Sequence, residues 1–194
     1  MIEVYVDGCC QPVNPGGVAT WGFVVRDGEK VHEASGVVGA GCLGDDVSNN
    51  VAEYTALIKA LEWLLENGYA EEEVVVRGDS QLAIRQLNGE YAVRAPRIRP
   101  LYERVVELAG RFRSVRFEWV PREENEEADS LSKRAYREFC LRHGDLVRRS
   151  YSRYLATERQ LRYIRALGGD PDPFMSKREA SRLIDRLKRK ATRR

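Results

Sequence analysis

The chain has no hydrophobic run that could cross a bilayer, although 43% of its 194 residues are hydrophobic. A membrane-spanning helix needs about 20 consecutive apolar residues, so we expect no membrane association and a cytoplasmic location. Cysteine is also scarce: Cys9, Cys10, Cys42 and Cys140 are the only four, and none forms the CxxC spacing of zinc or redox sites. Reduced thiols are expected. One disulfide stays open, because the high Glu and Arg content resembles that of thermophile proteins, in which intracellular disulfides occur.

Histidine is scarcer still, with only His32 and His143. Neither lies next to a plausible nucleophile, which argues against a Ser-His-Asp or Cys-His hydrolase. Asp and Glu, by contrast, number 30. Any catalysis is therefore expected to depend on carboxylates.

Positive charge is concentrated at one end of the chain, although the formal net charge is only +2. Residues 1–145 hold 17 Lys and Arg against 25 Asp and Glu, a net charge of −8, whereas residues 146–194 hold 15 against 5, a net charge of +10. An acidic body with a basic tail indicates that the tail contacts a polyanion. We therefore expect a domain at 1–145 and a basic helical extension at 146–194 that binds nucleic acid.

Hydrophobic periodicity predicts a mixed α/β domain with the element order βββαβααβα. Strands are expected at 1–7, 18–26, 30–38, 73–77 and 115–120, and helices at about 48–66, 80–87, 101–112 and 125–141. Asp27-Gly28 predicts a hairpin between the second and third strands. In the tail, helical segments around 158–167 and 177–190 predict a small helical hairpin.

Two acids are expected at the same edge of the sheet. Asp7 ends the first strand and Asp79 follows the fourth. A β-α-β crossover makes these strands parallel, so their C-terminal ends meet where catalytic sites gather. Each acid alone also has an ordinary structural explanation, Asp7 as a turn residue before Gly8 and Asp79 as the cap of the next helix.

Glu53 lies on the apolar stripe of the first helix, within about 40° of Leu57, Ala60 and Leu64 at about 100° per residue. A buried unpaired charge costs several kcal/mol, so Glu53 requires a basic partner or a metal ion. Asp129, on the last helix of the domain, could by itself be a solvated helix position.

Four acids that converge without basic partners would repel one another, and divalent cations resolve this repulsion. Oxygen ligands favour Mg²⁺, with Mn²⁺ as a possible substitute. Two such ions about 4 Å apart suit phosphodiester hydrolysis.

Five short motifs lie on the predicted elements within residues 1 to about 142. They are Asp7-Gly8-Cys9-Cys10, Asn14-Pro15-Gly16-Gly17 before Trp21-Gly22, Asn49-Asn50-Val51-Ala52-Glu53, Gly78-Asp79-Ser80-Gln81, and Val120-Pro121-Arg122 leading to Ala128-Asp129-Ser130-Leu131. In this order they resemble the type 1 ribonuclease H family. The resemblance implies a ribonuclease H-like fold with a mixed five-stranded sheet flanked by helices. It also implies an endonuclease that cuts the RNA strand of RNA/DNA hybrids and leaves 5′-phosphate and 3′-hydroxyl ends. The catalytic metal ligands would be Asp7, Glu53, Asp79 and Asp129.

The resemblance further implies that Cys10, Asn14, Asn50 and Gln81 contact the RNA strand around the cut. Small polar side chains in a shallow groove can recognise 2′-hydroxyls, which distinguish RNA from DNA. Helix capping by Asn50 and simple packing by Cys10 remain alternatives.

The loop before the last helix of the domain differs from that of many family members, which carry a histidine there. In this chain the loop reads Arg122-Glu123-Glu124-Asn125. We hypothesise that Arg122, Glu123 or Glu124 partly replaces the histidine.

The long basic protrusion of some family members is also short here. Its nearest basic cluster is Arg94, Arg97 and Arg99, which either contacts phosphates or forms a solvated turn. We expect the tail, which ends in Lys188-Arg189-Lys190 and Arg193-Arg194, to strengthen substrate binding without supplying chemistry, because each phosphate neutralised adds salt-dependent affinity.

Two other functions stay open. One is a nuclease of the same broad fold that acts on DNA, and the other is a non-catalytic nucleic-acid-binding domain. The sequence does not indicate an oligomeric state, and a monomer is the default expectation.

Overall fold

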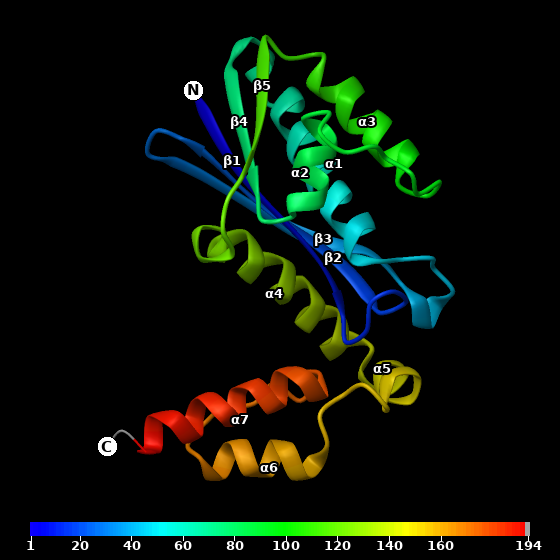
Figure 1. The fold of residues 1–194 in the computed structure, drawn as a ribbon, viewed down its shortest axis with the longest axis vertical. Coiled ribbons are helices and arrows are strands. Elements are labelled where there is room, and N and C mark those ends of the chain that lie inside the picture. Colours follow the sequence, from blue (N-terminus) through cyan, green and yellow to red (C-terminus); the bar gives the residue numbers. More distant parts are fainter. Residues whose placement is uncertain (193–194) are drawn as a thin grey trace.

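A mixed sheet of five strands forms the centre of the computed structural model, which describes residues 1–192 (Figure 1). The strands are β1 (Ile2–Gln11), β2 (Val18–Asp27), β3 (Lys30–Ala40), β4 (Glu73–Gly78) and β5 (Ser114–Trp119). Their order in the sheet is β3-β2-β1-β4-β5. The first three strands form an antiparallel meander, whereas β4 pairs in parallel with both β1 and β5. The predicted fold class and element order are confirmed.

Helices cover both faces of this sheet. Those of the first 142 residues are α1 (Asn49–Glu66), α2 (Gln81–Leu87), α3 (Arg99–Ala109) and α4 (Glu126–Arg142), with short 3-10 turns η1 (Gly41–Leu43), η2 (Tyr69–Glu71) and η3 (Arg122–Glu124). Helices α1 and α3 pack together on one face, and α4 crosses β1, β2 and β3 on the other (Figure 1). The main core lies under α1, where Val4, Val6, Leu57 and Leu61 are fully buried. The sheet is thus held between two helical layers.

Strand β1 is longer than the predicted segment 1–7, because it continues past Asp7 to Gln11. The Asp7-Gly8 pair resembles a turn signal, but both residues lie inside the ladder and pair with Gly22 and Trp21 of β2. The interpretation of Asp7 as a turn residue at the end of the strand is therefore wrong. Pairing of β1 with β4, however, ends at Val6 and Gly78, so Asp7 still lies beside the end of β4.

The basic tail contains three helices, α5 (Gly144–Tyr151), α6 (Glu158–Ala166) and α7 (Lys177–Thr192). Helices α6 and α7 are the predicted hairpin. Helix α5 was not predicted, and it runs across the expected domain boundary at residue 145. It is only eight residues long and begins with a glycine, so its helical pattern in the sequence is weak. The terminal pair Arg193-Arg194 lies outside the described residues.

The extension packs against the domain through a second apolar cluster. Its buried members are Val18, Ala40, Tyr136, Phe139, Cys140, Val147, Tyr151, Leu155 and Phe174. The Tyr151 hydroxyl accepts a hydrogen bond from the Cys42 amide at 2.8 Å and donates one to the Gly16 carbonyl at 3.0 Å. The Tyr136 hydroxyl donates to the Phe174 carbonyl at 2.9 Å. These contacts join the extension to both α4 and the loop between β1 and β2.

Within residues 1–192, no helix is both long and apolar enough to span a membrane. All four cysteines carry free thiols.

Candidate active site

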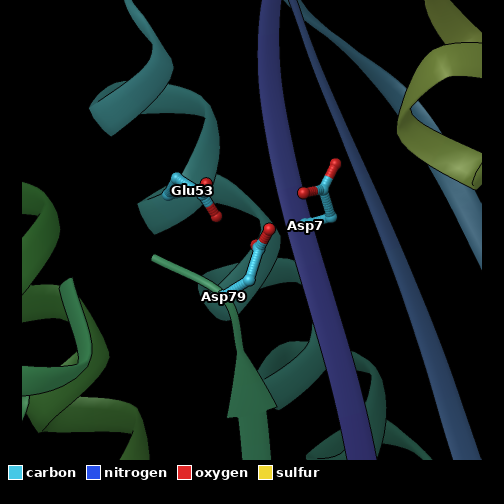
Figure 2. A group of neighbouring side chains, drawn as sticks. All are labelled: Asp7, Glu53 and Asp79. Atoms are coloured by element: carbon cyan, nitrogen blue, oxygen red, sulfur yellow. The ribbon is translucent and has the colours of Figure 1, made fainter. Parts of the chain in front are cut away.

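Three of the four predicted acids converge at the centre of the sheet. Asp7 comes from β1, Glu53 from the first turns of α1, and Asp79 from the residue after β4 (Figure 2). One carboxylate oxygen from each lies within 4.8 Å of the others. Asp7 is 3% exposed and Glu53 6% exposed. This is a compact, mostly buried group of oxygen ligands.

Local features of the backbone bring these three acids together. The parallel pairing of Val6 with Gly78 makes Asp7 and Asp79 the next residues on neighbouring strands. Helix α1 approaches β1 at Gly8, where an added Cβ would lie 2.2 Å from the Glu53 amide nitrogen. That amide belongs to the helix backbone and cannot move aside, so only glycine fits at position 8. The close approach also lets the Gly8 amide donate a hydrogen bond to Glu53 Oε2 at 3.1 Å.

The protonation of the cluster reflects burial and mutual repulsion. Burial raises the pKa of Asp7 to about 6, with smaller upward contributions from the charges of Asp79 and Asp129, while a hydrogen bond from Ser132 opposes the rise. Burial, then the charges of Asp7 and Asp79, raise the pKa of Glu53 well above its usual range. Within residues 1–192, none of these three carboxylates forms an ion pair with a lysine or arginine. A divalent cation would supply the missing positive charge.

Asp129 stands at the rim of the cluster rather than inside it. Its carboxylate pairs with Arg122, and with Lys133 at 2.5 Å. The expectation of acids without basic partners is therefore wrong for Asp129, because Lys133 lies one helical turn further along α4 and η3 brings Arg122 alongside. The side chain of Asp129 is only 14% exposed. Its assignment as a metal ligand stays a prediction.

Helix α4 reaches the cluster because β2 has a glycine where they cross. An added Cβ at Gly22 would lie 2.7 Å from both the Leu131 Cβ and the Ser132 amide nitrogen. The close packing places Ser132, which is fully buried, against Asp7, to which its hydroxyl donates a hydrogen bond. Ser132 was not among the site residues predicted from the sequence. Its position three residues after Asp129, on the same face of α4, was the available signal.

Asn125 is a second site residue that was not predicted from the sequence. Its side chain is 1% exposed, and its Nδ2 donates to the Val6 carbonyl at 2.9 Å and to Asp79 Oδ1 at 3.3 Å. Asn125 therefore ties the loop before α4 to both acid-bearing strands. Its Oδ1 atom is buried with no hydrogen-bond partner in the part of the chain that the structure describes.

The predicted substrate contacts divide into two kinds. Cys10 and Asn14 have structural partners: the Cys10 amide donates to Asn49 Oδ1 at 2.8 Å, and Asn14 Oδ1 accepts from the Asn49 amide at 2.9 Å. Asn50 and Gln81 are exposed at the starts of α1 and α2. They are not the caps, since Ser48 and Ser80 fill those positions. The alternative interpretations of Asn50 and Asp79 as helix caps are therefore wrong.

The charged residues predicted near the site differ in whether they contact the acids. Of the three loop residues that are candidates to replace the histidine, Arg122 contacts an acid, whereas Glu123 and Glu124 line a hollow of about 440 Å³ together with Glu3 and Arg26. Arg97, in the short basic segment, pairs with Asp46 at 2.7 Å.

Comparisons with known proteins agree with this geometry. Residues 5–135 match the model of the reverse transcriptase-like family. Ribonuclease HI of Halobacterium salinarum is 37% identical over 135 residues, which make up 69% of this chain and 63% of that protein. This chain therefore spans less than two thirds of the length of that curated relative.

Two solved structures are similar over most of their own length. RNase H1 from Halobacterium salinarum matches with a TM-score of 0.62 and 34% identity, over 71% of this chain and 98% of that one. LC11-RNase H1 in complex with an RNA/DNA hybrid, a protein isolated from compost, matches with a TM-score of 0.62 and 36% identity, over 70% and 96%.

The five-stranded sheet and the acids at its centre define the ribonuclease H-like class of fold. Within this class, the sequence identity above 30% is to ribonuclease HI proteins along the shared domain. The chain belongs to the type 1 ribonuclease H family.

Proposed function

We propose that this protein is an endonuclease that hydrolyses phosphodiester bonds in the RNA strand of RNA/DNA hybrids by a two-metal-ion mechanism, leaving 5′-phosphate and 3′-hydroxyl ends. The observation that carries the proposal is the group formed by Asp7, Glu53 and Asp79, whose ligand oxygens lie within 4.8 Å of one another. Buried carboxylates without basic partners would be costly in a domain that bound no cation.

The donor set fits Mg²⁺, and Mn²⁺ as a substitute, because all of its atoms are hard carboxylate oxygens. Asp7, Glu53 and Asp79 would hold the ions, and Asp129 would complete the set from the rim. The chemistry that such ions supply is activation of the attacking water and stabilisation of the leaving oxygen. The chain itself holds Asp7 in place through Ser132 and Asp79 through Asn125.

Recognition of the RNA strand is proposed for Cys10, Asn14, Asn50 and Gln81. Asn50 and Gln81 are exposed at the N-termini of α1 and α2, where amide side chains can hydrogen-bond to 2′-hydroxyls. Asn14 and the Cys10 amide both bind Asn49, so they would act mainly by shaping the loop against α1. The similarity to LC11-RNase H1, which was solved with an RNA/DNA hybrid, supports this choice of substrate.

The four free thiols suit a reducing compartment, and we propose a cytoplasmic location. A DNA-acting nuclease and a non-catalytic binding domain are the competing functions. The presence of all four acids argues against the non-catalytic binding domain.

The test uses strand-labelled RNA/DNA, RNA/RNA and DNA/DNA duplexes with Mg²⁺, Mn²⁺ or chelator. We expect metal-dependent cutting of only the RNA strand of the hybrid. Glu53→Gln should abolish it, while Glu66→Gln, which makes the same change at an exposed position on the same helix, should not. Cutting of the DNA duplex, or no cutting by the wild type, would contradict the proposal.

A further inference from the structure

A cleft of about 650 Å³ lies where the extension meets the catalytic domain. One wall comes from the domain and includes Gln11, Arg122 and Lys133. The other wall comes from α7 and the residues before it. Its members are Met175, Ser176, Glu179, Arg182, Leu183 and Arg186.

The side chains that line this cleft carry a net positive charge. Four cationic side chains line it, and Glu179 is the only acid among the lining residues. Both oxygens of Glu179 are already engaged: Oε1 accepts from Gln11 Nε2 at 3.1 Å, and Oε2 accepts from the Ser176 amide at 2.8 Å. Glu179 therefore ties α7 to the end of β1 and offers little negative charge to a ligand.

Arg182 and Arg186 are the cations available to a ligand. They lie four residues apart, so they share one face of α7, and both are exposed. Within residues 1–192, neither forms an ion pair. Arg122 and Lys133 on the opposite wall pair with Asp129, which places the inner end of the cleft beside Asp129 at the rim of the acid cluster.

Contacts of the segment just before α7 hold this helix close to the domain. Arg137 of α4 pairs with Asp172 at 3.3 Å, and the Arg148 guanidinium lies 4.7 Å from the centre of the Phe174 ring. The Phe174 carbonyl accepts from Tyr136 of α4. In Figure 1, α7 lies between α4 and α6. The arginines are therefore presented to the cleft by a docked helix.

We propose that this cleft is a phosphate-binding subsite that grips the sugar-phosphate backbone of the substrate duplex beyond the nucleotides at the cut. The inference rests on the proposed function, because it takes the bound duplex as the ligand. Charge complementarity and continuity with the acid cluster argue for this occupant: a polyanion that extends away from the acids on this side passes between Arg122 and Arg186. An arginine can hold a phosphate with two parallel hydrogen bonds.

The test compares the full-length double variant R182Q/R186Q with a matched control, R159Q/R165Q, which removes the same charge from exposed positions on α6. Binding of an RNA/DNA hybrid is measured by fluorescence anisotropy in chelator over a range of salt. We expect R182Q/R186Q to raise Kd by about tenfold and to lower the salt slope by about 1 to 2, since each phosphate contact adds about 0.9. The control should change both values much less, and both variants should melt like the wild type.

A second measurement identifies the phosphate. Neutral methylphosphonate linkages are placed one at a time along each strand of the hybrid. At the contacted position the neutral linkage should weaken binding by the wild type but not by R182Q/R186Q, as expected for coupled partners in a double-mutant cycle.

Several outcomes would overturn the inference. These are an unchanged Kd, an equal loss in the α6 control, or no position at which the linkage and the variant are coupled. An oligoglutamate probe that loses affinity for R182Q/R186Q while hybrid binding stays the same would assign the cleft to an acidic peptide. Cleavage by the wild type is measured separately, so failure of the subsite and failure of the nuclease proposal are distinguishable.

Discussion

Ser132 donates a hydrogen bond to Asp7 across 125 positions of sequence and so joins helix α4 to the central strand at the acid cluster. Both residues are buried, so no water replaces this donor easily. Burial raises the pKa of Asp7 to about 6, and without this opposing bond the rise would be larger. Ser132 thus keeps more of Asp7 in the charged form that a metal ion requires.

Ser132→Ala should therefore raise the pKa of Asp7 further and weaken metal binding at neutral pH. We expect kcat/KM at pH 7 to fall by about 10-fold, the lower end for loss of a residue that supports a ligand. Most of the loss should return at higher pH, because the acidic limb of the pH profile moves upward. Ser130→Ala, which changes an exposed serine on the same helix, is the control. A uniform loss at every pH would contradict this role.

Asp7→Asn should stabilise the metal-free protein while removing activity. The folded-state pKa of about 6 lies above the ordinary value of 3.8, so ionisation of Asp7 costs stability. The cost is absent below about pH 4, grows between pH 4 and 6 and is constant above that range. At pH 8 we expect a gain of about 3 kcal/mol, or roughly 6–12 °C in Tm.

Thermal melts of the wild type and Asp7→Asn at pH 4 and pH 8, with and without Mg²⁺, check this prediction. Mg²⁺ should raise the Tm of the wild type by mass action and leave that of the variant nearly unchanged. An Asp7→Asn protein that melts lower than the metal-free wild type at pH 8 would show that the carboxylate is structural.

Alanine substitutions of the three residues that could replace the missing loop histidine should differ in their effect on kcat. Arg122 pairs with Asp129, and this pairing raises the pKa of its guanidinium above the ordinary value, so Arg122 cannot carry protons near neutral pH. Any contribution must be electrostatic. We expect Arg122→Ala to lower kcat by about 10-fold and to leave the shape of the pH profile unchanged.

Glu123→Ala and Glu124→Ala should have little effect on kcat, since both side chains line a separate hollow. Steady-state turnover of the three variants over a range of pH is the measurement. Unchanged turnover for all three would end the hypothesis that this loop replaces the histidine, and a changed profile for Glu123→Ala or Glu124→Ala would move the role to that residue.

Substitutions of the proposed RNA contacts should affect either folding stability or substrate recognition. The residues concerned are Asn14, Asn50 and Gln81. Asn14 accepts the Asn49 amide at the start of α1, so Asn14→Ala should cost about 1 kcal/mol in unfolding free energy, as for loss of a helix cap. Asn50→Ala and Gln81→Ala should leave stability within about 0.5 kcal/mol but reduce the preference for hybrid over DNA duplex. Urea unfolding and competitive binding measure the two effects. A large stability loss in Asn50→Ala or Gln81→Ala would contradict the assignment.

The sequence predicted the fold because its apolar periods and turn residues matched the elements that formed. Glu53 was predictable for the same reason, since a carboxylate on an apolar helical stripe needs a counter-ion. The prediction placed Asp7 correctly beside Asp79, although it assigned Asp7 to the end of a strand instead of its interior. The Asp-Gly pair reads as a turn in sequence, but the glycine serves the contact with α1 instead.

Other features depended on packing that no local pattern contains. The ion pair of Asp129 with Arg122 requires the turn η3 to fold back onto α4. The contacts of Ser132 and Asn125 with the acids require α4 to cross the sheet at Gly22. The docking of the extension depends on aromatic residues such as Tyr136 and Phe174, which in sequence could equally belong to a separate hairpin.

The Tyr151 hydroxyl links the extension to Gly16 in the loop between β1 and β2 and to Cys42 after β3, so we expect these parts to open together. Cys42 and Gly16 lose a hydrogen-bond partner whenever α5 undocks from the domain. Undocking of the extension should therefore destabilise the loop that carries Asn14. Amide hydrogen exchange at Cys42 should report that opening. Deleting the extension would also uncover Tyr136, Phe139 and Cys140, and a shortened chain would therefore measure loss of folding as well as loss of charge.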